Sequence, residues 1–273
     1  MRTQSEKARA FRALHERPGI FVIPNPWDAG SARLLASLGF EALATTSLGY
    51  AASIGRLDGS LSRDEILANC RAIAEATDLP VSADLENGYA DDPKEAAQTM
   101  RLAAEAGAVG GSIEDATGDP AKPIYDFVLA VERVAAACEV ARELPFPFTV
   151  TARAENYLHG RPDFDDTVRR LQAYAAAGAD VLYAPAVRDL ETIRRLVAAL
   201  PRPVNVVMGL ADPELTLQQL EAAGVKRVSV GGALARYALA AARDAARAMR
   251  EQGSFRWVKD IVAAKDLRSF LSR

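Results

Sequence analysis

Residues 103–115 read AAEAGAVGGSIED: a helical stretch that stops at Gly107, a short apolar run, and two acids, Glu114 and Asp115. Glycine readily adopts the left-handed conformation that ends many helices, and the run after it has the length and composition of a strand. The same order recurs along the chain. Other helical stretches end at Gly39, Gly178 and Gly224, or in Leu-Pro at residues 79–80, 144–145 and 200–201. Seven such stops predict a helix–strand unit repeated around a ring.

The strands expected from this repeat are short, apolar or β-branched runs at residues 20–23, 42–46, 80–83, 108–113, 148–152, 181–184, 204–207 and 227–230. Helices are expected between them at residues 28–38, 62–77, 93–106, 125–143, 163–177, 189–199, 214–223 and 233–252. This alternation predicts an α/β fold, a parallel (β/α)8 barrel of the TIM type, over residues 1–253. A doubly wound sheet would be expected to carry GxGxxG after its first strand, and the sequence has none there.

A helical extension is predicted over residues 254–273, after the barrel is complete. It contains Phe255, Trp257, Ile261 and Phe270, which need a surface to cover. These side chains could pack on either of two surfaces, the chain's own barrel or a neighbouring subunit.

Composition and charge limit the kind of ligand. The 273 residues carry a formal net charge of −3, and no basic tract or basic helix face stands out, which argues against nucleic acid or an anionic membrane as partner. The N-terminus lacks the apolar segment of a signal peptide, so a cytoplasmic protein with a small-molecule ligand is expected. Cys70 and Cys138 lie in Ala-rich helical patterns without a CxxC motif and are predicted to be buried free thiols.

Charged residues cluster just after three of the predicted strands. A charge there has no core to pack into, so it should face the opening where the strand ends meet. The pooled set predicts a negative pocket with one cation, suited to a divalent metal and a carboxylate substrate. Its members are Asp84, Glu86, Glu114, Asp115, Arg153 and Glu155.

Three of these carboxylates are candidate metal ligands. Asp84 and Glu86 are two residues apart, on the same side of an extended segment, and Glu114 ends the adjacent strand. Unpaired carboxylates raise one another's pKa, and a Mg²⁺ or Mn²⁺ ion removes that cost. The alternative is a set of surface ion pairs with lysine and arginine.

Arg153 is the candidate anion-binding residue, because its guanidinium can hold a carboxylate through two parallel hydrogen bonds. Glu155 can fix that guanidinium, and the alternative is a buried ion pair of these two residues closing the barrel mouth. Asp58 is an acid without a structural role in the loop before the predicted N-cap Ser62. His159, alone in a loop, is more often solvated than catalytic in such a context.

The chain resembles the isocitrate lyase/phosphoenolpyruvate mutase superfamily from PNPWDAGSARLLASLGF at residues 24–40 to the eighth strand. The most specific segments are DLENGY at residues 84–89, SIED at 112–115 and ARAE at 152–155. The resemblance implies a Mg²⁺-dependent (β/α)8 barrel, a homotetramer that exchanges its eighth helix, and cleavage or formation of a C–C or P–C bond beside a 2-oxo carboxylate through an enolate.

The resemblance also implies roles for single residues. Asp84, Glu86 and Glu114 correspond to the Mg²⁺ ligands, held directly or through water. Asp58, Arg153 and Glu155 correspond to catalytic residues. By the same resemblance, the residues that correspond to the family's substrate-binding set are Ser47, Leu48 and Gly49, in the turn at residues 45–50, together with Asp84 and Arg153.

The loop at residues 117–126 departs from the family pattern. The lyases carry a KKCGH-like segment here, whereas this chain reads TGDPAKPIYD, without cysteine, histidine or asparagine. The sequence favours a C–C lyase, by a retro-aldol or decarboxylation-like step, that acts on a small 2-oxo acid or dicarboxylate. P–C bond chemistry and a barrel that binds a 2-oxo acid without turnover remain as alternatives.

Overall fold

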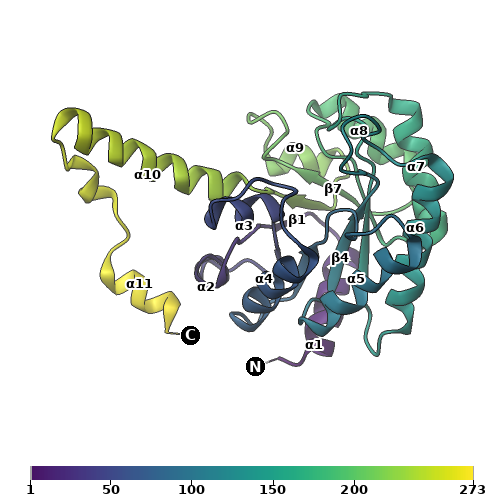
Figure 1. The fold of residues 1–273 in the computed structure, drawn as a ribbon, viewed down its shortest axis with the longest axis horizontal. Helices are drawn as coiled ribbons and strands as arrows, with labels where there is room; N and C mark the ends of the chain where they lie inside the picture. The colour runs from purple at the N-terminus through teal and green to yellow at the C-terminus, as the bar shows by residue number, and fades with distance from the viewer. Residues whose placement is uncertain (1, 273) are drawn as a thin grey trace.

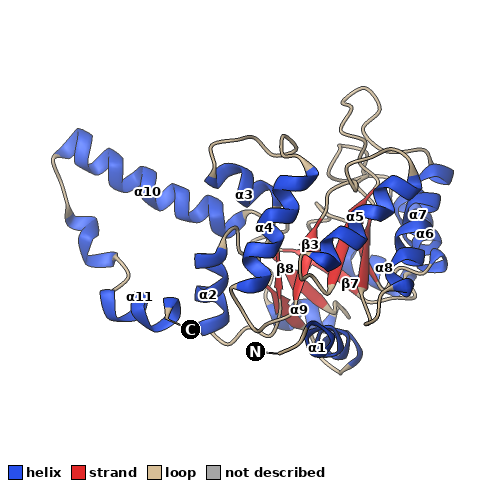
Figure 2. Ribbon diagram, turned by 60° about the horizontal axis from the view of Figure 1, so that its bottom comes forward, coloured by secondary structure: helices blue, strands red, loops and turns tan. Residues whose placement is uncertain are grey.

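The computed structural model describes residues 2–272, in which eight parallel strands curve into a barrel with helices around the outside (Figures 1 and 2). The strands follow one another around the barrel in the order β1-β8-β7-β6-β5-β4-β3-β2. This confirms the predicted (β/α)8 fold. Their bounds are β1 Phe21–Ile23, β2 Leu43–Ala44, β3 Val81–Asp84, β4 Gly110–Glu114, β5 Thr149–Arg153, β6 Val181–Tyr183, β7 Val204–Val207 and β8 Arg227–Ser229.

The barrel closes between β1 and β2 without a regular ladder between these two described strands. One backbone hydrogen bond crosses the seam, from Ala44 N to Pro24 O at 3.1 Å. Asn25 adds a side-chain bridge: its amide nitrogen donates to Thr45 O, and its Oδ1 accepts from the amides of Val230 and Gly231, each at 2.9 Å. A single side chain thus joins the ends of β1, β2 and β8 at the mouth.

The helices within residues 2–272 are α1 Gln4–Glu16, α2 Ala29–Ser37, α3 Ser47–Ser53, α4 Arg63–Glu75, α5 Pro93–Glu105, α6 Phe127–Glu143, α7 Phe164–Ala177, α8 Leu190–Ala199, α9 Leu217–Ala222, α10 Ala233–Gln252, the 3₁₀ helix η1 Arg256–Asp260, and α11 Ala264–Leu271. The glycine stops are confirmed, with φ of +86° at Gly39, +99° at Gly107, +116° at Gly178 and +84° at Gly224. None of these described helices is both long and apolar enough to cross a membrane.

The main core lies between the barrel strands and the surrounding helices, where small and apolar side chains of α5, α6 and α7 pack on β4 and β5. Both cysteines belong to it: Cys70 is fully buried, Cys138 is 2% exposed, and neither forms a disulfide. Burial raises the pKa of both thiols to about 12. The predicted buried free thiols are therefore confirmed.

The Cys70→Ala/Cys138→Ala double variant should keep ligand binding and any activity, because both thiols are buried and protonated at neutral pH. Calorimetric titration and an activity assay of the variant beside the parent would check this. A loss of more than about tenfold in a folded variant, or about 1.4 kcal/mol, would show that a thiol takes part in the chemistry.

The eighth barrel helix, α10, takes a different path from the helices that surround the barrel. Instead of lying on the barrel wall, α10 runs outward from it, and within the helix only Ala235 is buried (Figure 1). It contacts α3 near the mouth, while α11 returns to pack on α2, where Phe270 is 9% exposed. Phe255 and Ile261 remain 63% and 58% exposed. The chain's own surface therefore covers only part of the extension, and a domain boundary at residue 253 stays a prediction.

Candidate active site in the barrel mouth

A cavity of about 620 Å³ opens at the carboxyl ends of the strands, and all eight strands contribute to its wall. Loop residues complete it, including Asp58 after α3, Thr117 and Gly118 after β4, and His159 after β5. Charge is unevenly distributed, because the ends of β3, β4 and β5 carry the acids and Arg153. The strand residues that line the cavity include Ile23, Ala44, Asp84, Glu114, Arg153, Tyr183, Val207 and Ser229.

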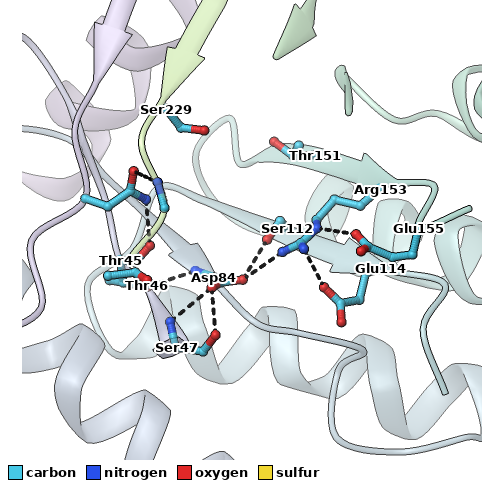
Figure 3. Close-up of polar contacts among 12 residues, drawn as sticks. Thr45, Thr46, Ser47, Asp84, Ser112, Glu114, Thr151, Arg153, Glu155 and Ser229 are labelled. Carbon is cyan, nitrogen blue, oxygen red and sulfur yellow. Dashed lines mark hydrogen bonds and ion pairs between the residues drawn. The ribbon is translucent and has the colours of Figure 1, made fainter. Parts of the chain in front are cut away.

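Arg153 lies at the centre of the charged wall and is bound by three carboxylates (Figure 3). Its Nε donates to Glu155 Oε1 at 2.7 Å, Nη1 lies 3.2 Å from Asp84 Oδ1, and Nη2 lies 3.0 Å from Glu114 Oε2. Glu155 therefore holds the guanidinium through a buried ion pair, which fits both interpretations given to these two residues. The guanidinium is not free to receive an anion in this state, since each of its nitrogens already has a carboxylate partner. An anionic ligand must share or replace one of them.

The expected small-residue turn at residues 45–50 is the first turn of a short helix, α3. Thr46 caps it, accepting from Gly49 N at 3.2 Å. Asp84 Oδ2 accepts from both the amide and the hydroxyl of Ser47, at 3.0 and 3.1 Å (Figure 3). The backbone amides of Ser47 and Gly49, two of the residues predicted to bind the substrate, are therefore engaged within the protein. Leu48 lines the mouth beside them.

Glu86 is held in an unusual backbone conformation directly after β3, with φ of +47°. Its Oε1 is one of the few buried side-chain oxygens in residues 2–272 that have no hydrogen-bond partner. Burial, together with the negative charges of Asp84 and Asp58, raises the pKa of Glu86 to about 7. Burial also raises the pKa of Glu114 well above its ordinary value, while Arg153 opposes that rise. The site therefore holds more carboxyl groups than one guanidinium can stabilise as carboxylates, and the protonated forms of Glu86 and Glu114 are favoured.

Asp58 lines the rim of the same cavity, as expected of an acid without a capping role. Partial burial and the charge of Asp84 raise its pKa, and a hydrogen bond from Ser47 opposes that rise. Asp58 thus lies near Asp84, whose Oδ2 accepts from the Ser47 hydroxyl.

Asp115 does not face the opening, contrary to the sequence expectation. Side chains alternate along a strand, so the residue after inward-facing Glu114 points to the helix layer. There Asp115 Oδ2 accepts from Arg170 and Tyr174 at 3.0 and 2.7 Å, and Oδ1 accepts from Glu155 N at 2.8 Å. Asp115 supports the site from behind.

Several polar residues that sequence reasoning missed lie lower in the barrel interior. Arg227 is 5% exposed and donates to Asn205 Oδ1 at 2.8 Å and Thr151 Oγ1 at 3.1 Å. Asn205 in turn donates to Ser229 Oγ at 3.0 Å. The signal in the sequence was weak, because a basic residue next to Lys226 and single polar residues in short strands look like surface positions.

The residues at the mouth fit a hard divalent cation in their chemistry. Mg²⁺ and Mn²⁺ prefer carboxylate oxygens, and Glu86 Oε1 is a buried acceptor with nothing bonded to it. No three acidic, histidine or cysteine side chains in residues 2–272 already stand at metal-ligand spacing. Asp84 and Glu114 are instead turned toward Arg153. A Mg²⁺ site formed by Asp84, Glu86 and Glu114 therefore stays a prediction.

Fold and site together define a (β/α)8 barrel with an acidic, arginine-containing pocket at its strand ends, and comparisons with known proteins identify the family. The family model for phosphoenolpyruvate phosphomutase matches residues 11–250. 2-Methylisocitrate lyase from Salmonella typhimurium (strain LT2) is 30% identical, and the match covers 94% of this chain and 90% of that protein. The chain belongs to the isocitrate lyase/phosphoenolpyruvate mutase superfamily.

Two solved structures are similar along nearly the whole chain. A protein from Burkholderia cenocepacia J2315, provisionally assigned as a lyase/mutase, is 59% identical with a TM-score of 0.97, covering 99% of this chain and 97% of that one. Phosphonopyruvate hydrolase, solved in complex with oxalate and Mg²⁺, is 25% identical with a TM-score of 0.87, covering 97% of this chain and 95% of that one. The family thus includes lyases, mutases and hydrolases.

Proposed function

We propose that the protein is a Mg²⁺-dependent carbon–carbon lyase that acts on a small 2-oxo acid or dicarboxylate. The observation that carries the proposal is the gathering of Asp84, Glu86 and Glu114 around Arg153 on one wall of the mouth. The cavity of about 620 Å³ suits a small ligand. Family membership supports Mg²⁺-assisted chemistry, because phosphonopyruvate hydrolase was solved with this ion.

In this proposal Asp84, Glu86 and Glu114 would hold Mg²⁺, and the ion would supply positive charge to stabilise a negative oxygen beside the 2-oxo carboxylate. The first turn of α3, at Ser47, Leu48 and Gly49, orients the carboxylate end of the substrate.

The remaining roles belong to Arg153 and two acids. Arg153 receives a second anionic group once a carboxylate partner moves aside, and Glu155 keeps the guanidinium in place. The raised pKa of Asp58 suits its carboxyl group to exchange a proton with the substrate, with the proton held on a carboxyl oxygen of Asp58.

The short loop at residues 117–126 favours a second candidate, a barrel that binds a 2-oxo acid without turnover. In the structure the loop is a small hairpin-like excursion closed by a bridge between Ala116 and Ile124. Thr117 and Gly118 reach the cavity, and neither is a strong proton donor. His159 lines the mouth from another loop and stays a weaker candidate for a catalytic residue.

The deciding experiment is an NMR screen of 2-oxo acids, 2-hydroxy diacids and phosphonopyruvate with Mg²⁺. Release of pyruvate or glyoxylate from a diacid would support the lyase, whereas phosphate would indicate P–C chemistry. Ligand binding without any product across the set would favour the binding barrel.

We also propose a homo-oligomer, a tetramer by family resemblance, in which a second copy covers α10 and η1. The large side chains exposed there include Tyr237, Leu239 and Phe255, at 78%, 50% and 63% exposure. Truncation after Gly253 should shift the protein toward smaller oligomers, because it removes part of this apolar surface. Sedimentation velocity of both forms would check this, and a monomeric full-length chain would refute it.

A further inference from the structure

The loop after β3 holds Glu86 in a backbone that needs external support. Glu86 and Tyr89 have φ of +47° and +61°, a region that residues other than glycine rarely adopt, and Gly88 lies between them at +78°. A non-glycine residue in this region is strained and persists there only when its surroundings fix it. A side chain at Gly88 would also meet Ala96, with a contact of 2.9 Å from the added Cβ.

Arg133, on the inner side of α6, supplies most of that support. Its Nη1 donates to the carbonyls of Ala90 and Asp91, the latter at 2.6 Å, and its Nη2 donates to the carbonyl of Asn87. Thr99 from α5 donates to the Gly88 carbonyl at 2.7 Å. One guanidinium thus binds three of the loop's carbonyls, which the shape of an arginine allows and that of a lysine does not.

Arg133 is too deeply buried to be a surface charge. It is 1% exposed, and its contacts in residues 2–272 are backbone carbonyls and a ring rather than a carboxylate. Its guanidinium carbon lies 4.2 Å from the centre of the Tyr125 ring, and the Tyr125 hydroxyl donates to Asp91 Oδ1 at 2.5 Å. Arg133, Tyr125 and Asp91 therefore form a closed contact between α6 and the loop after β3.

The contact between Arg133 and Tyr125 also involves the loop after β4, because Tyr125 lies at the end of that loop. Tyr125 directly follows the bridge between Ala116 and Ile124, and Thr117 N donates to Pro123 O at 3.0 Å inside that loop. Arg170 donates to the Tyr125 carbonyl at 3.0 Å and fixes the residue from the other side. The position of Tyr125 thus sets where residues 117–123 leave the barrel and reach the mouth.

We propose that Arg133 is a positioning residue with two contacts. Its hydrogen bonds to the carbonyls of Asn87, Ala90 and Asp91 fix the Glu86 carboxylate in the mouth, and its stacking on Tyr125 anchors the loop at residues 117–123 at its base. The part that concerns metal affinity rests on the proposed function. The part that concerns the backbone of residues 85–92 does not.

The test compares Arg133→Lys, Arg133→Met and Tyr125→Phe with the parent. Arg142→Met is the matched control: Arg142 also lies on α6 and also donates to a carbonyl, that of Ala177 at 3.2 Å, but at the far end of the barrel. Hydrogen exchange by mass spectrometry on the metal-free proteins reports the backbone at residues 85–92 and 116–125. Calorimetric titration with Mn²⁺ reports the affinity of the site.

In both Arg133 variants, exchange across residues 85–92 should be at least about tenfold faster, and Mn²⁺ should bind about 10–100-fold more weakly, the usual effect of removing a group that orients metal ligands. Tyr125→Phe keeps the ring but loses the bond to Asp91, so a smaller change in the same direction is expected. Arg142→Met should change neither quantity.

Unchanged exchange across residues 85–92 in folded Arg133→Lys would overturn the inference, as would unchanged Mn²⁺ affinity in a variant whose parent binds the ion. If Arg133→Met does not fold, Arg133→Lys and Tyr125→Phe decide. A parent that binds no Mn²⁺ would refute the proposed metal site, and the exchange comparison would then decide the role of Arg133 alone.

Discussion

Asp84→Ala should abolish Mg²⁺ and Mn²⁺ binding while the protein stays folded. Asp84 is the acid that connects the first turn of α3 with Arg153, so its loss removes a metal ligand and the partner of Ser47 together. The variant should fold because Arg153 keeps Glu114 and Glu155 as partners, and no buried charge is left unpaired. Calorimetric titration with each ion measures the binding.

The control for this variant is Asp126→Ala, which removes an exposed carboxylate paired with Lys122 and should leave metal affinity unchanged. Thermal unfolding of both variants without metal separates a loss of ligands from a loss of structure. If folded Asp84→Ala binds the metal as tightly as the parent does, Asp84 is not a metal ligand.

Arg153→Lys should weaken the binding of diacids by about 1–3 kcal/mol with little effect on the metal. The lysine keeps the charge but loses the planar fork, so it cannot keep contacts to Glu155 and Glu114 while also pairing with a ligand. Titration of parent and variant with oxaloacetate, 2-oxoglutarate and pyruvate in saturating Mg²⁺ measures the effect. Pyruvate, which has no second anionic group, should be affected least.

Arg170→Lys is the matched control, because the Arg170 side chain is also largely buried, at 7% exposure against 14% for Arg153, but pairs with Asp115 and Asp166 behind the site. It should lower the thermal stability without selecting between diacids and pyruvate. If Arg153→Lys binds diacids as tightly as the parent does, Arg153 is a structural ion-pair partner of Glu155, and the proposed substrate class loses its main support.

Much of the fold could be predicted from the sequence, because the stops between helices and strands are local. A glycine such as Gly107 or Gly178 ends a helix through its own backbone freedom, whatever surrounds it. The strand-end position of Asp84 and Glu114 follows from the same periodicity. The path of α10 could not be predicted from its own residues, because its amphipathic pattern shows that one face needs cover without showing what covers it.

The contacts of the charged residues were harder to predict from the sequence. The sequence placed Arg153 near the acids, but its ion pairs with both Asp84 and Glu114 depend on the curvature that brings β3, β4 and β5 together. Arg133 lies in the helical pattern AVERVAAA, where an arginine beside a glutamate looks solvent-exposed. Its burial depends on the path of the loop after β3, which no local pattern specifies.

The buried guanidinium of Arg227 has a consequence for how the chain selects its fold. It is fixed by neutral partners on two other strands, Asn205 on β7 and Thr151 on β5. Sliding β8 along its neighbour would leave a desolvated charge without these bonds, at a cost of several kcal/mol. Compact states with a shifted strand register are therefore higher in energy than the native state. The polar interior thus widens the energy gap between them, on which cooperative folding depends.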